Sequence, residues 1–304
     1  VALTPARSRT WTTGVGYATD TGAKIRLDYR NQRLNDKGHQ FEFNSQVSEV
    51  LGGAAVSYRL PDGKRRDEWF SINMGYKYEN PEDSRSDECR LGLQQTRRRS
   101  GDWRETRFID YIHEDYRVGD ERGTSNLIVP GISWAEQPLL LTGRPRRGNR
   151  LNLRLSGTDE WLGSDTAFVQ VETGGKLILP LGANARLLTR LEAGWTIKHD
   201  FSDLPFSVRY FAGGDGSVRG YDYKALGPTD VDGNVIGGAN KLVGSLEFDA
   251  QVYGNWSAAV FVDSGNAFNS FSDMSLKTSV GGGMRCYWPL GPVRFDVGVP
   301  LDYV

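Results

Sequence analysis

The sequence lacks any long apolar run, and it contains only two cysteines and three histidines among 304 residues. The longest apolar stretch, Leu177 to Leu181, is interrupted by Pro180 and is far shorter than the roughly 18 residues that a membrane-spanning helix requires. We therefore expect no helix to cross a bilayer. The chain also opens without the charged and apolar regions of a signal peptide, which indicates a mature protein or an excised domain.

Patterns that enzymes use are also scarce. The histidines show no H-E-x-x-H or paired Cys-His spacing, so neither a metal site nor a catalytic triad is predicted. The glycine-rich stretch at 213–220 is neither a G-x-G-x-x-G motif nor a phosphate-binding loop. The net charge of −1 disfavours nucleic acid as a partner, because such binding usually needs a basic excess. We expect no enzyme activity, no metal and no cofactor.

What the sequence does contain is glycine, aromatic residues and alternation. There are 37 glycines, 8 Trp, 13 Tyr and 13 Phe, with an apolar content of only 38%, which fits many short strands better than a helical core. Within residues 69–79, Phe70 and Ile72 share one face of a strand, while Asn73 and Lys77 share the other. Lipid on one side and water on the other produce this pattern, which recurs along the whole chain.

The alternation predicts an all-β protein, in which residues 1–304 form one transmembrane antiparallel β-barrel. Fifteen strands are visible, and since barrels of one chain normally have an even number, we expect a 16-stranded type whose last strand is missing or truncated. Residues 103–116 fit least well, because Phe108 and Ile112 share a side with charged residues, and we predict a bulge there. The expected strands begin near Trp11, Lys24, Gln40, Ala54, Trp69, Cys89, Trp103, Ser125, Arg150, Thr166, Ala185, Lys241, Trp256, Leu276 and Val293.

A soluble all-β protein made of two sandwiches is the structural alternative. Aromatic residues at the strand ends favour the barrel, because they are typical of the girdles at membrane interfaces. Cys89 and Cys286 fall in phase with the lipid-facing residues of strands far apart around the wall. We therefore expect no disulfide between them, since their Cα atoms cannot approach to about 6 Å.

The longest connection between strands, residues 199–240, is expected to lie on the external side and to fold into the lumen as a lid. Its glycines permit positive φ and bring Arg219 to a projecting tip. By strand parity, Asp263 and Glu247 point into the lumen, where a planar guanidinium suits pairing with carboxylates. On these isolated residues alone, an ordinary solvated arginine remains the simpler interpretation.

Together these segments resemble the signature of the outer-membrane insertase superfamily that includes BamA, TamA and the two-partner secretion transporters. In that superfamily, a loop with an Arg-Gly-Tyr or Arg-Gly-Phe tip enters the barrel, and its arginine contacts an acidic residue in a Phe-x-Asp-x-Gly strand. Residues 219–221 and 261–265 match both halves, and residues 13–22 and 34–39 resemble the opening barrel hairpin of TamA in particular. The resemblance implies a lid motif of Gly213, Gly214, Val218, Arg219, Gly220 and Tyr221, acidic partners Asp263 and Glu247, and an inner strand motif that includes Phe261 and Gly265.

The same resemblance implies a lateral gate between the first and last strands, where an exposed edge templates an incoming strand by β-augmentation. The first strand carries the small residues Thr12, Gly14, Gly16 and Ala18 on its inner side, which pack weakly and would ease opening. Accommodation of lumen contents is an equally weighted alternative for these glycines.

The implied function is assembly of β-barrel proteins such as autotransporters in the outer membrane of a Gram-negative bacterium. The implied partners are outer-membrane lipids, unfolded outer-membrane protein clients and an inner-membrane-anchored TamB-like protein. The POTRA domains that precede the barrel in this superfamily are absent from this chain. The alternative function is a two-partner secretion type polypeptide transporter or a plugged pore.

Overall fold

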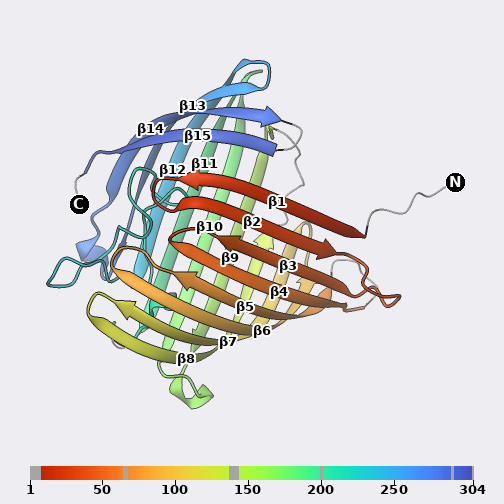
Figure 1. Ribbon diagram of the computed structural model, residues 1–304, viewed down its shortest axis with the longest axis vertical. Helices are drawn as coiled ribbons and strands as arrows, with labels where there is room; N and C mark the ends of the chain where they lie inside the picture. Colours follow the sequence, from red (N-terminus) through yellow and green to blue (C-terminus); the bar gives the residue numbers. More distant parts are fainter. Residues whose placement is uncertain (1–7, 64–67, 137–143, 199–200, 289–290, 303–304) are drawn as a thin grey trace.

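The computed structural model describes residues 8–63, 68–136, 144–198, 201–288 and 291–302. The alternating segments form fifteen strands, and three single-turn 3-10 helices lie between them (Figure 1). The predicted all-β class is confirmed. The strands are β1 (Arg9–Ala18), β2 (Gly22–Asn31), β3 (Gln40–Val47), β4 (Leu51–Pro61), β5 (Trp69–Glu79), β6 (Ser84–Arg98), β7 (Trp103–Val118), β8 (Glu121–Glu136), β9 (Gly148–Thr158), β10 (Phe168–Leu181), β11 (Ala185–Lys198), β12 (Asn240–Tyr253), β13 (Trp256–Phe268), β14 (Lys277–Trp288) and β15 (Gly291–Pro300), and the helices are η1 (Glu160–Leu162), η2 (Phe206–Val208) and η3 (Phe271–Asp273).

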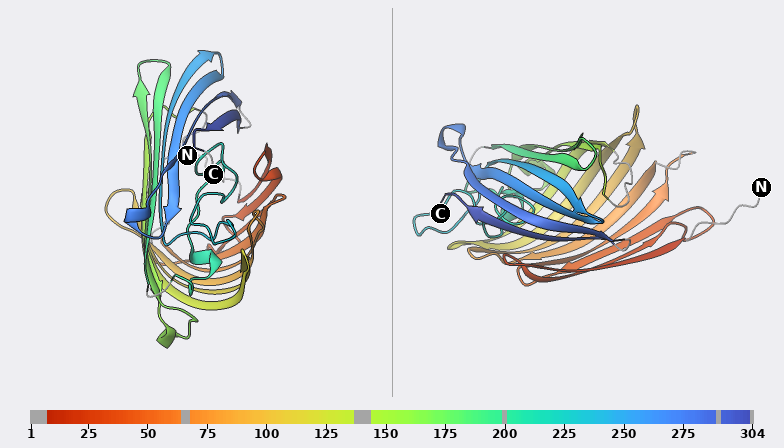
Figure 2. Two further views of the ribbon diagram at one scale, coloured as in Figure 1. Left: turned by 90° about the vertical axis from the view of Figure 1, so that its left-hand side faces the viewer. Right: turned by 90° about the horizontal axis from the view of Figure 1, so that it is seen from above.

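Each strand pairs with its neighbours in the chain, so one antiparallel sheet runs in the order β1 to β15. The sheet curves around a lumen, as both views in Figure 2 show. It is not closed: among the described residues, β1 pairs with β2 alone and β15 with β14 alone. The fifteen predicted strands all exist, although β6 begins at Ser84 rather than near Cys89. A sixteenth strand stays a prediction.

The two faces of the sheet have opposite chemistry. On the outer face, apolar side chains such as Val15 and Met74 are 90% and 69% exposed. On the inner face, polar side chains such as Ser71 and Asp110 are buried. An apolar surface this extensive is unstable in water, whereas it suits the hydrocarbon core of a membrane. The described residues include no helix long and apolar enough to span a membrane.

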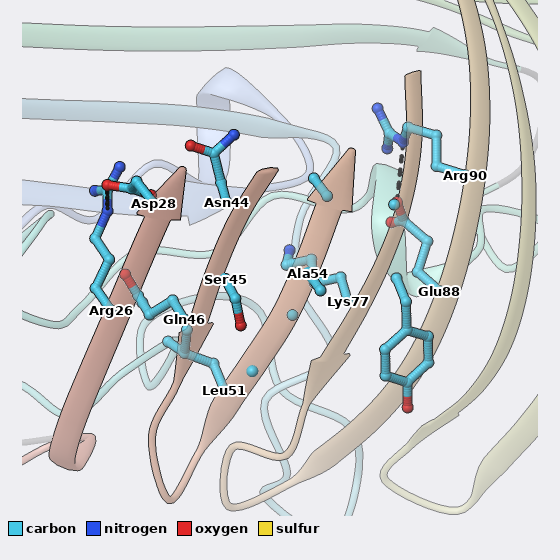
Figure 3. Close-up of a pocket in the computed structure, with 15 residues that line it drawn as sticks. Arg26, Asp28, Asn44, Ser45, Gln46, Leu51, Ala54, Lys77, Glu88 and Arg90 are labelled. Carbon is cyan, nitrogen blue, oxygen red and sulfur yellow. Dashed lines mark hydrogen bonds and ion pairs between the residues drawn. The ribbon is translucent and has the colours of Figure 1, made fainter. Parts of the chain in front are cut away.

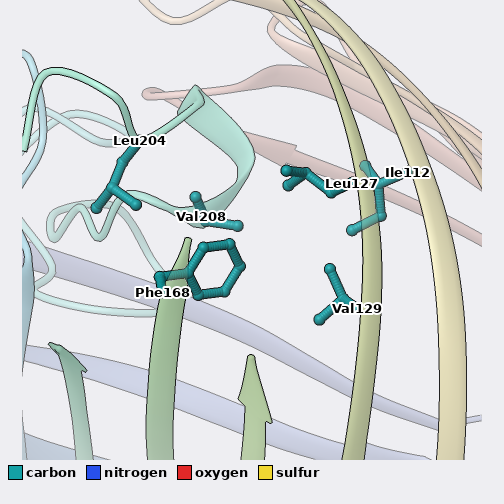
Figure 4. Close-up of a cluster of buried hydrophobic side chains, with 6 residues drawn as sticks. All are labelled: Ile112, Leu127, Val129, Phe168, Leu204 and Val208. Carbon is teal, nitrogen blue, oxygen red and sulfur yellow. The ribbon is translucent and has the colours of Figure 1, made fainter. Parts of the chain in front are cut away.

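The predicted bulge in 103–116 is wrong. Strand β7 pairs without interruption with both β6 and β8. Phe108 and Ile112 can share the inner face with Asp110 because both are covered. Ile112 packs against the lid residues Leu204 and Val208, and Phe108 lies under the guanidinium of Arg154 on β9 at 4.3 Å. Figure 4 shows Ile112 in a buried apolar cluster with Leu204 and Val208 of the β11–β12 connection, together with Leu127, Val129 and Phe168.

The two cysteines are free thiols. Cys89 on β6 is exposed, as its outward phase predicts. Cys286 on β14 is buried, because the Trp288 indole covers it and donates a hydrogen bond to its Sγ at 2.5 Å.

Candidate functional site

Residues 201–239, here called the lid segment, connect β11 to β12 and lie inside the curve of the sheet (teal in Figure 2, left). His199 and Asp200, at the start of the predicted lid, lie outside the described residues. Glycines shape the tip of the segment. Gly213 and Gly220 have φ values of +97° and +92°, which other residues rarely adopt. A Cβ on Gly213 would lie 2.4 Å from the Asp222 carbonyl oxygen, so the turn is also too tight for a side chain.

The lid tip carries Arg219, whose guanidinium is buried against β13. Its Nε donates to Asp263 Oδ2 at 2.7 Å, and its Nη2 donates to Asp263 Oδ1 at 2.9 Å. The Arg219 backbone N–H donates to the same carboxylate at 3.2 Å. The guanidinium carbon also lies 3.4 Å from the centre of the Phe261 ring, a cation–π contact. Three hydrogen bonds to one carboxylate fix both the direction and the depth of the loop tip.

Glu247 on β12 completes the predicted pair of acidic partners. Its Oε2 accepts a hydrogen bond from Arg219 Nη1 at 2.8 Å. Burial by itself lowers the pKa of Arg219, but hydrogen bonds to Asp263 and Glu247 raise that pKa above the ordinary value. The guanidinium therefore stays charged, and two carboxylates compensate for its removal from water.

Three further residues of this cluster were missed by sequence reasoning. Asp296 on β15 lies 3.4 Å from Arg219 Nη1, and the Ser245 hydroxyl donates to Asp263 at 2.6 Å. Arg285 on β14 is almost fully buried, and its Nη2 lies 2.9 Å from Glu247 and 3.2 Å from Asp296. Only the strand register shows that these side chains from four strands lie at the same height in the barrel.

The other residues of the lid motif pack this tip against the wall. Val218 is fully buried in a cluster that contains Tyr221 and Val243 of β12. The Tyr221 hydroxyl donates to the Thr278 carbonyl at 3.1 Å and to the Asp302 carbonyl at 2.9 Å. Gly214 has a φ of +93°, and a Cβ there would lie 3.3 Å from the Tyr223 Cα, so this position leaves little room for a side chain. Gly265 sits where β12 and β13 come close, since a Cβ there would lie 2.7 Å from the Leu242 carbonyl oxygen.

A second anchor binds the lid segment to the opposite wall. Lys224 Nζ lies 3.0 Å from Glu79 at the end of β5, and the Tyr223 hydroxyl donates to the same carboxylate at 2.5 Å. Lys224 is also the one described residue other than glycine with positive φ, at 61°. Its ammonium packs over the rings of Phe206 and Phe211 at 3.9 and 4.8 Å. Burial lowers the pKa of Lys224 to about 8, although Glu79 opposes the shift.

Electrostatic contacts also fix the first part of the lid segment. Arg209 donates to both oxygens of Glu121 on β8, at 3.1 and 2.9 Å. The Ser207 N–H donates to Glu114 on β7 at 3.1 Å. The lid segment thus touches β5, β7 and β8 on one side of the lumen and β12 to β15 on the other. Its contacts therefore reach across the lumen near one end of the barrel, and Arg219 reaches further in, to the middle of β13 (Figure 1).

The predicted gate residues lie on an unpaired edge. In the β1–β2 register, Thr12, Gly14 and Gly16 stand opposite Asp28, Arg26 and Lys24, which places them on the inner face. A Cβ on Gly16 would meet nothing within 4 Å, so the inner side of β1 is thinly packed. Ala18 stands opposite Gly22 at the end of the strand.

The lid segment reaches both free edges of the sheet. A Cβ on Gly220 would lie 3.0 Å from the carbonyl carbon of Gly298 on β15. On the other edge, the Asp215 N–H donates to Asp20 in the β1–β2 turn at 3.2 Å. The lid tip therefore contacts both sides of the opening between β1 and β15, through Gly298 on β15 and Asp20 in the β1–β2 turn.

The inner wall of β2 to β6 carries a separate hollow of about 420 Å³ (Figure 3). Gly53 and Ala55 leave space there, and charged side chains such as Arg26, Asp28 and Arg90 border it. Arg26 is paired with Asp28 at 2.8 Å, and Arg90 with Glu88 at 3.0 Å. Lys77, the third cation of the lining, pairs with Glu79 at 2.7 Å, so each charged side chain that borders the hollow has a partner of opposite charge. Among the described residues, no group of three His, Cys, Asp or Glu side chains is placed to hold a metal ion.

A curved sheet that is apolar outside and polar inside, with a loop anchored in its lumen by a buried arginine, defines a transmembrane β-barrel of the outer membrane. The profile of the Omp85 superfamily domain matches residues 10–303. The chain belongs to the Omp85 superfamily. It is thus an integral outer-membrane protein of a Gram-negative bacterium.

Individual relatives agree with this assignment. The chain is 30% identical over 290 residues to the outer membrane protein assembly factor BamA of Nitratidesulfovibrio vulgaris, covering 90% of this chain and 33% of the relative. It resembles the crystal structure of BamA from Haemophilus ducreyi lacking POTRA domains 1–3, with TM-score 0.82 and 18% identity over 98% of this chain and 68% of the other. CdiB from Acinetobacter baumannii gives TM-score 0.65 and 16% identity, over 98% and 57% of the two chains. The chain spans about a third of the length of the curated relative it matches.

Proposed function

We propose that this chain is the membrane-embedded part of an outer-membrane protein assembly factor, which accepts strands of unfolded β-barrel clients at the edge of β1. The observation that carries the proposal is the pair of unpaired edges on β1 and β15, bridged by a lid tip that contacts both sides. An unpaired edge offers a row of free N–H and C=O groups to an incoming strand. Main-chain hydrogen bonds drive this addition, so the activity requires no enzyme chemistry and no cofactor.

The lid segment has a defined part in this proposal. Its Arg219 cluster ties together β12, β13, β14 and β15, so the C-terminal side of the opening is a rigid wall. The thinly packed inner face of β1, with Gly14 and Gly16, is the compliant side. A client strand then adds to a flexible edge while the opposite edge keeps its shape.

A finer proposal concerns the type of assembly factor. The opening hairpin, residues 13–22 and 34–39, favours a TamA-like protein that serves autotransporters and works with an inner-membrane-anchored TamB-like partner. Purification from crosslinked cells tests this point. Recovery of one large inner-membrane-anchored protein supports the TamA-like type, whereas recovery of outer-membrane lipoproteins alone contradicts it.

Liposome insertion tests the proposed function itself. The full-length protein is reconstituted in liposomes, an unfolded outer-membrane protein is added, and folded client is measured by its heat-modifiable mobility on gels. We expect faster client folding than in empty liposomes, and a loss of this acceleration in Arg219→Ala. Client folding at the rate of empty liposomes would contradict the proposal.

The alternative is a polypeptide transporter or plugged pore, and the buried contacts of the lid segment with both walls of the lumen favour it. Planar-bilayer conductance separates the two functions. A sharp rise in conductance on deletion of residues 211–221, without any client insertion by the intact protein, would favour the pore.

A further inference from the structure

A second cavity on the inner wall, of about 380 Å³, has an unbalanced charge. It lies on strands β9 to β12 and is closed on one side by Tyr210 of the lid segment. Five cationic side chains line it against two carboxylates, although the whole chain has a net charge of −1. Gly174 and Asn152 lie side by side in its lining. The five cations are Arg150, Arg154, Lys176, Arg190 and Lys241, and the carboxylates are Glu172 and Glu192.

The strand register places three of these cations in one row. Lys176 on β10 stands directly opposite Arg150 on β9 and directly opposite Arg190 on β11. Directly opposed Cβ atoms lie about 5 Å apart, and like charges in such pairs are destabilising. Arg190 donates to the carbonyl oxygens of Gly216 and Ser217 in the lid segment. Lys176 and Arg150 form no hydrogen bond or ion pair with any described residue.

Two buried donors in the same cavity are also unsatisfied. Arg154 lies 3.7 Å from Glu172 and 3.8 Å from Asp110, and its buried Nε makes no hydrogen bond. The Tyr210 hydroxyl lies near Thr196 without completing a hydrogen bond to it. Tyr210 is 7% exposed, so bulk water does not readily satisfy its hydroxyl. Buried donors without partners are rare in folded proteins, and each implies an occupant or a role.

We propose that this cavity is a binding site for carboxylate side chains of an acidic polypeptide segment inside the lumen. An anion there relieves the repulsion within the Arg150–Lys176–Arg190 row and accepts hydrogen bonds from Arg154 and Tyr210. The lid segment already presents one such group, because Asp215 lines an adjoining cavity of about 100 Å³ together with Lys176 and Arg190.

The position of the cavity favours a polypeptide over a lipid headgroup. It opens to the lumen, whereas lipid contacts the outer face of the same strands, where Leu151 and Leu177 are exposed. The site goes beyond the proposed function, because binding in the lumen is separate from strand addition at the edge of β1. It gives the lumen a means of holding an acidic segment of a client chain.

Isothermal titration of the full-length protein in detergent with hexa-aspartate tests the site. We expect saturable binding of hexa-aspartate and none of hexa-asparagine. Lys176→Gln and Tyr210→Phe should each weaken binding about tenfold, as expected for loss of a hydrogen bond to a charged group. The matched control is Arg26→Gln, a lumen arginine on the opposite wall that is paired with Asp28, and it should leave the affinity unchanged.

Three outcomes overturn the proposal. Hexa-aspartate that does not bind at all shows that the cavity takes no carboxylates. An equal loss in Lys176→Gln and Arg26→Gln shows only general attraction to a charged lumen. Pyrophosphate that binds more tightly and displaces hexa-aspartate assigns the cavity to a phosphate group instead. Heat-modifiable gel mobility checks that each variant is folded, and Tyr210→Phe removes only a hydroxyl.

Discussion

Arg219 of the lid segment and Asp263 of β13 share three hydrogen bonds, of 2.7, 2.9 and 3.2 Å, although 44 positions separate them in the chain. The contact joins a loop tip to the middle of a barrel wall. Since Asp263 is fully buried and Arg219 nearly so, each residue depends on the other to remain charged in its place.

Replacement of Arg219 is expected to release the lid tip. Arg219→Ala leaves Asp263 buried without its partner, which typically costs about 3–5 kcal/mol. Arg219→Lys keeps the positive charge but loses the planar guanidinium, so we expect it to hold the lid tip less firmly than arginine and more firmly than alanine. Limited proteolysis of residues 201–239 measures the release, with Arg33→Ala, a largely exposed arginine, as the control. Equal protease resistance in the Arg219 and Arg33 variants would show that the contact does not hold the lid.

Gly220 tests whether the lid tip must approach β15 closely. Gly220→Ala places a Cβ 3.0 Å from Gly298 and imposes φ of +92° on alanine, at a cost of about 1–3 kcal/mol. Gly216→Ala is the matched control, because a Cβ there meets nothing within 4 Å. The free energy of unfolding, measured by urea titration in lipid vesicles, should fall for Gly220→Ala alone. A similar loss in both variants would contradict the close approach.

Much of this arrangement was accessible from the sequence, because a membrane barrel repeats every two residues. The period placed fifteen strands and pointed Asp263 and Glu247 into the lumen. It could not place Arg285 or Asp296 beside Arg219, since height along the barrel depends on the register of several strands together. It also suggested a bulge at Phe108 and Ile112, because it could not show that Ile112 packs against the lid segment and that Phe108 lies under Arg154 of β9.

The second anchor, at Lys224, predicts a pH dependence. Lys224 titrates at about 8 in the folded protein, below the 10.5 of an unperturbed lysine, so folding weakens its hold on the proton. Burial of the charged lysine therefore lowers the free energy of unfolding. This destabilisation is present in full below pH 8 and disappears as the pH rises toward 10.5. The pKa of Lys224 depends on its burial and on the nearby charges of Glu79, Lys77 and Glu114. The Tyr223 hydroxyl also lies beside the ammonium, because it donates to Glu79.

We therefore expect lid protection to increase between pH 8 and 10, by about 3 kcal/mol at most. Proteolysis rates of residues 201–239 across this range measure the change, and Lys224→Met serves as the reference for every other titrating group. Protection that decreases in the wild type, or that increases equally in Lys224→Met, would show that this lysine does not control the lid.

The apolar contact between the lid segment and β7 predicts a contrast between two isoleucines on one strand. Ile112 packs against Leu204 and Val208, whereas Ile109 faces outward and is 54% exposed. Ile112→Ala should reduce the free energy of unfolding by about 2–4 kcal/mol, as expected for a buried large-to-small change. Ile109→Ala should have a much smaller effect on stability and none on lid proteolysis. Equal effects of the two changes on lid proteolysis would contradict the packing in Figure 4.

Site-specific photocrosslinking during client insertion tests the central claim most directly. A photoreactive residue replaces Val15 on the free edge strand β1 or Ile109 on β7, which pairs on both sides; both positions face outward. The account predicts that the client is captured from position 15 while it folds, and not from position 109. Equal capture at both positions, or capture at position 109 alone, would contradict strand addition at the edge of β1.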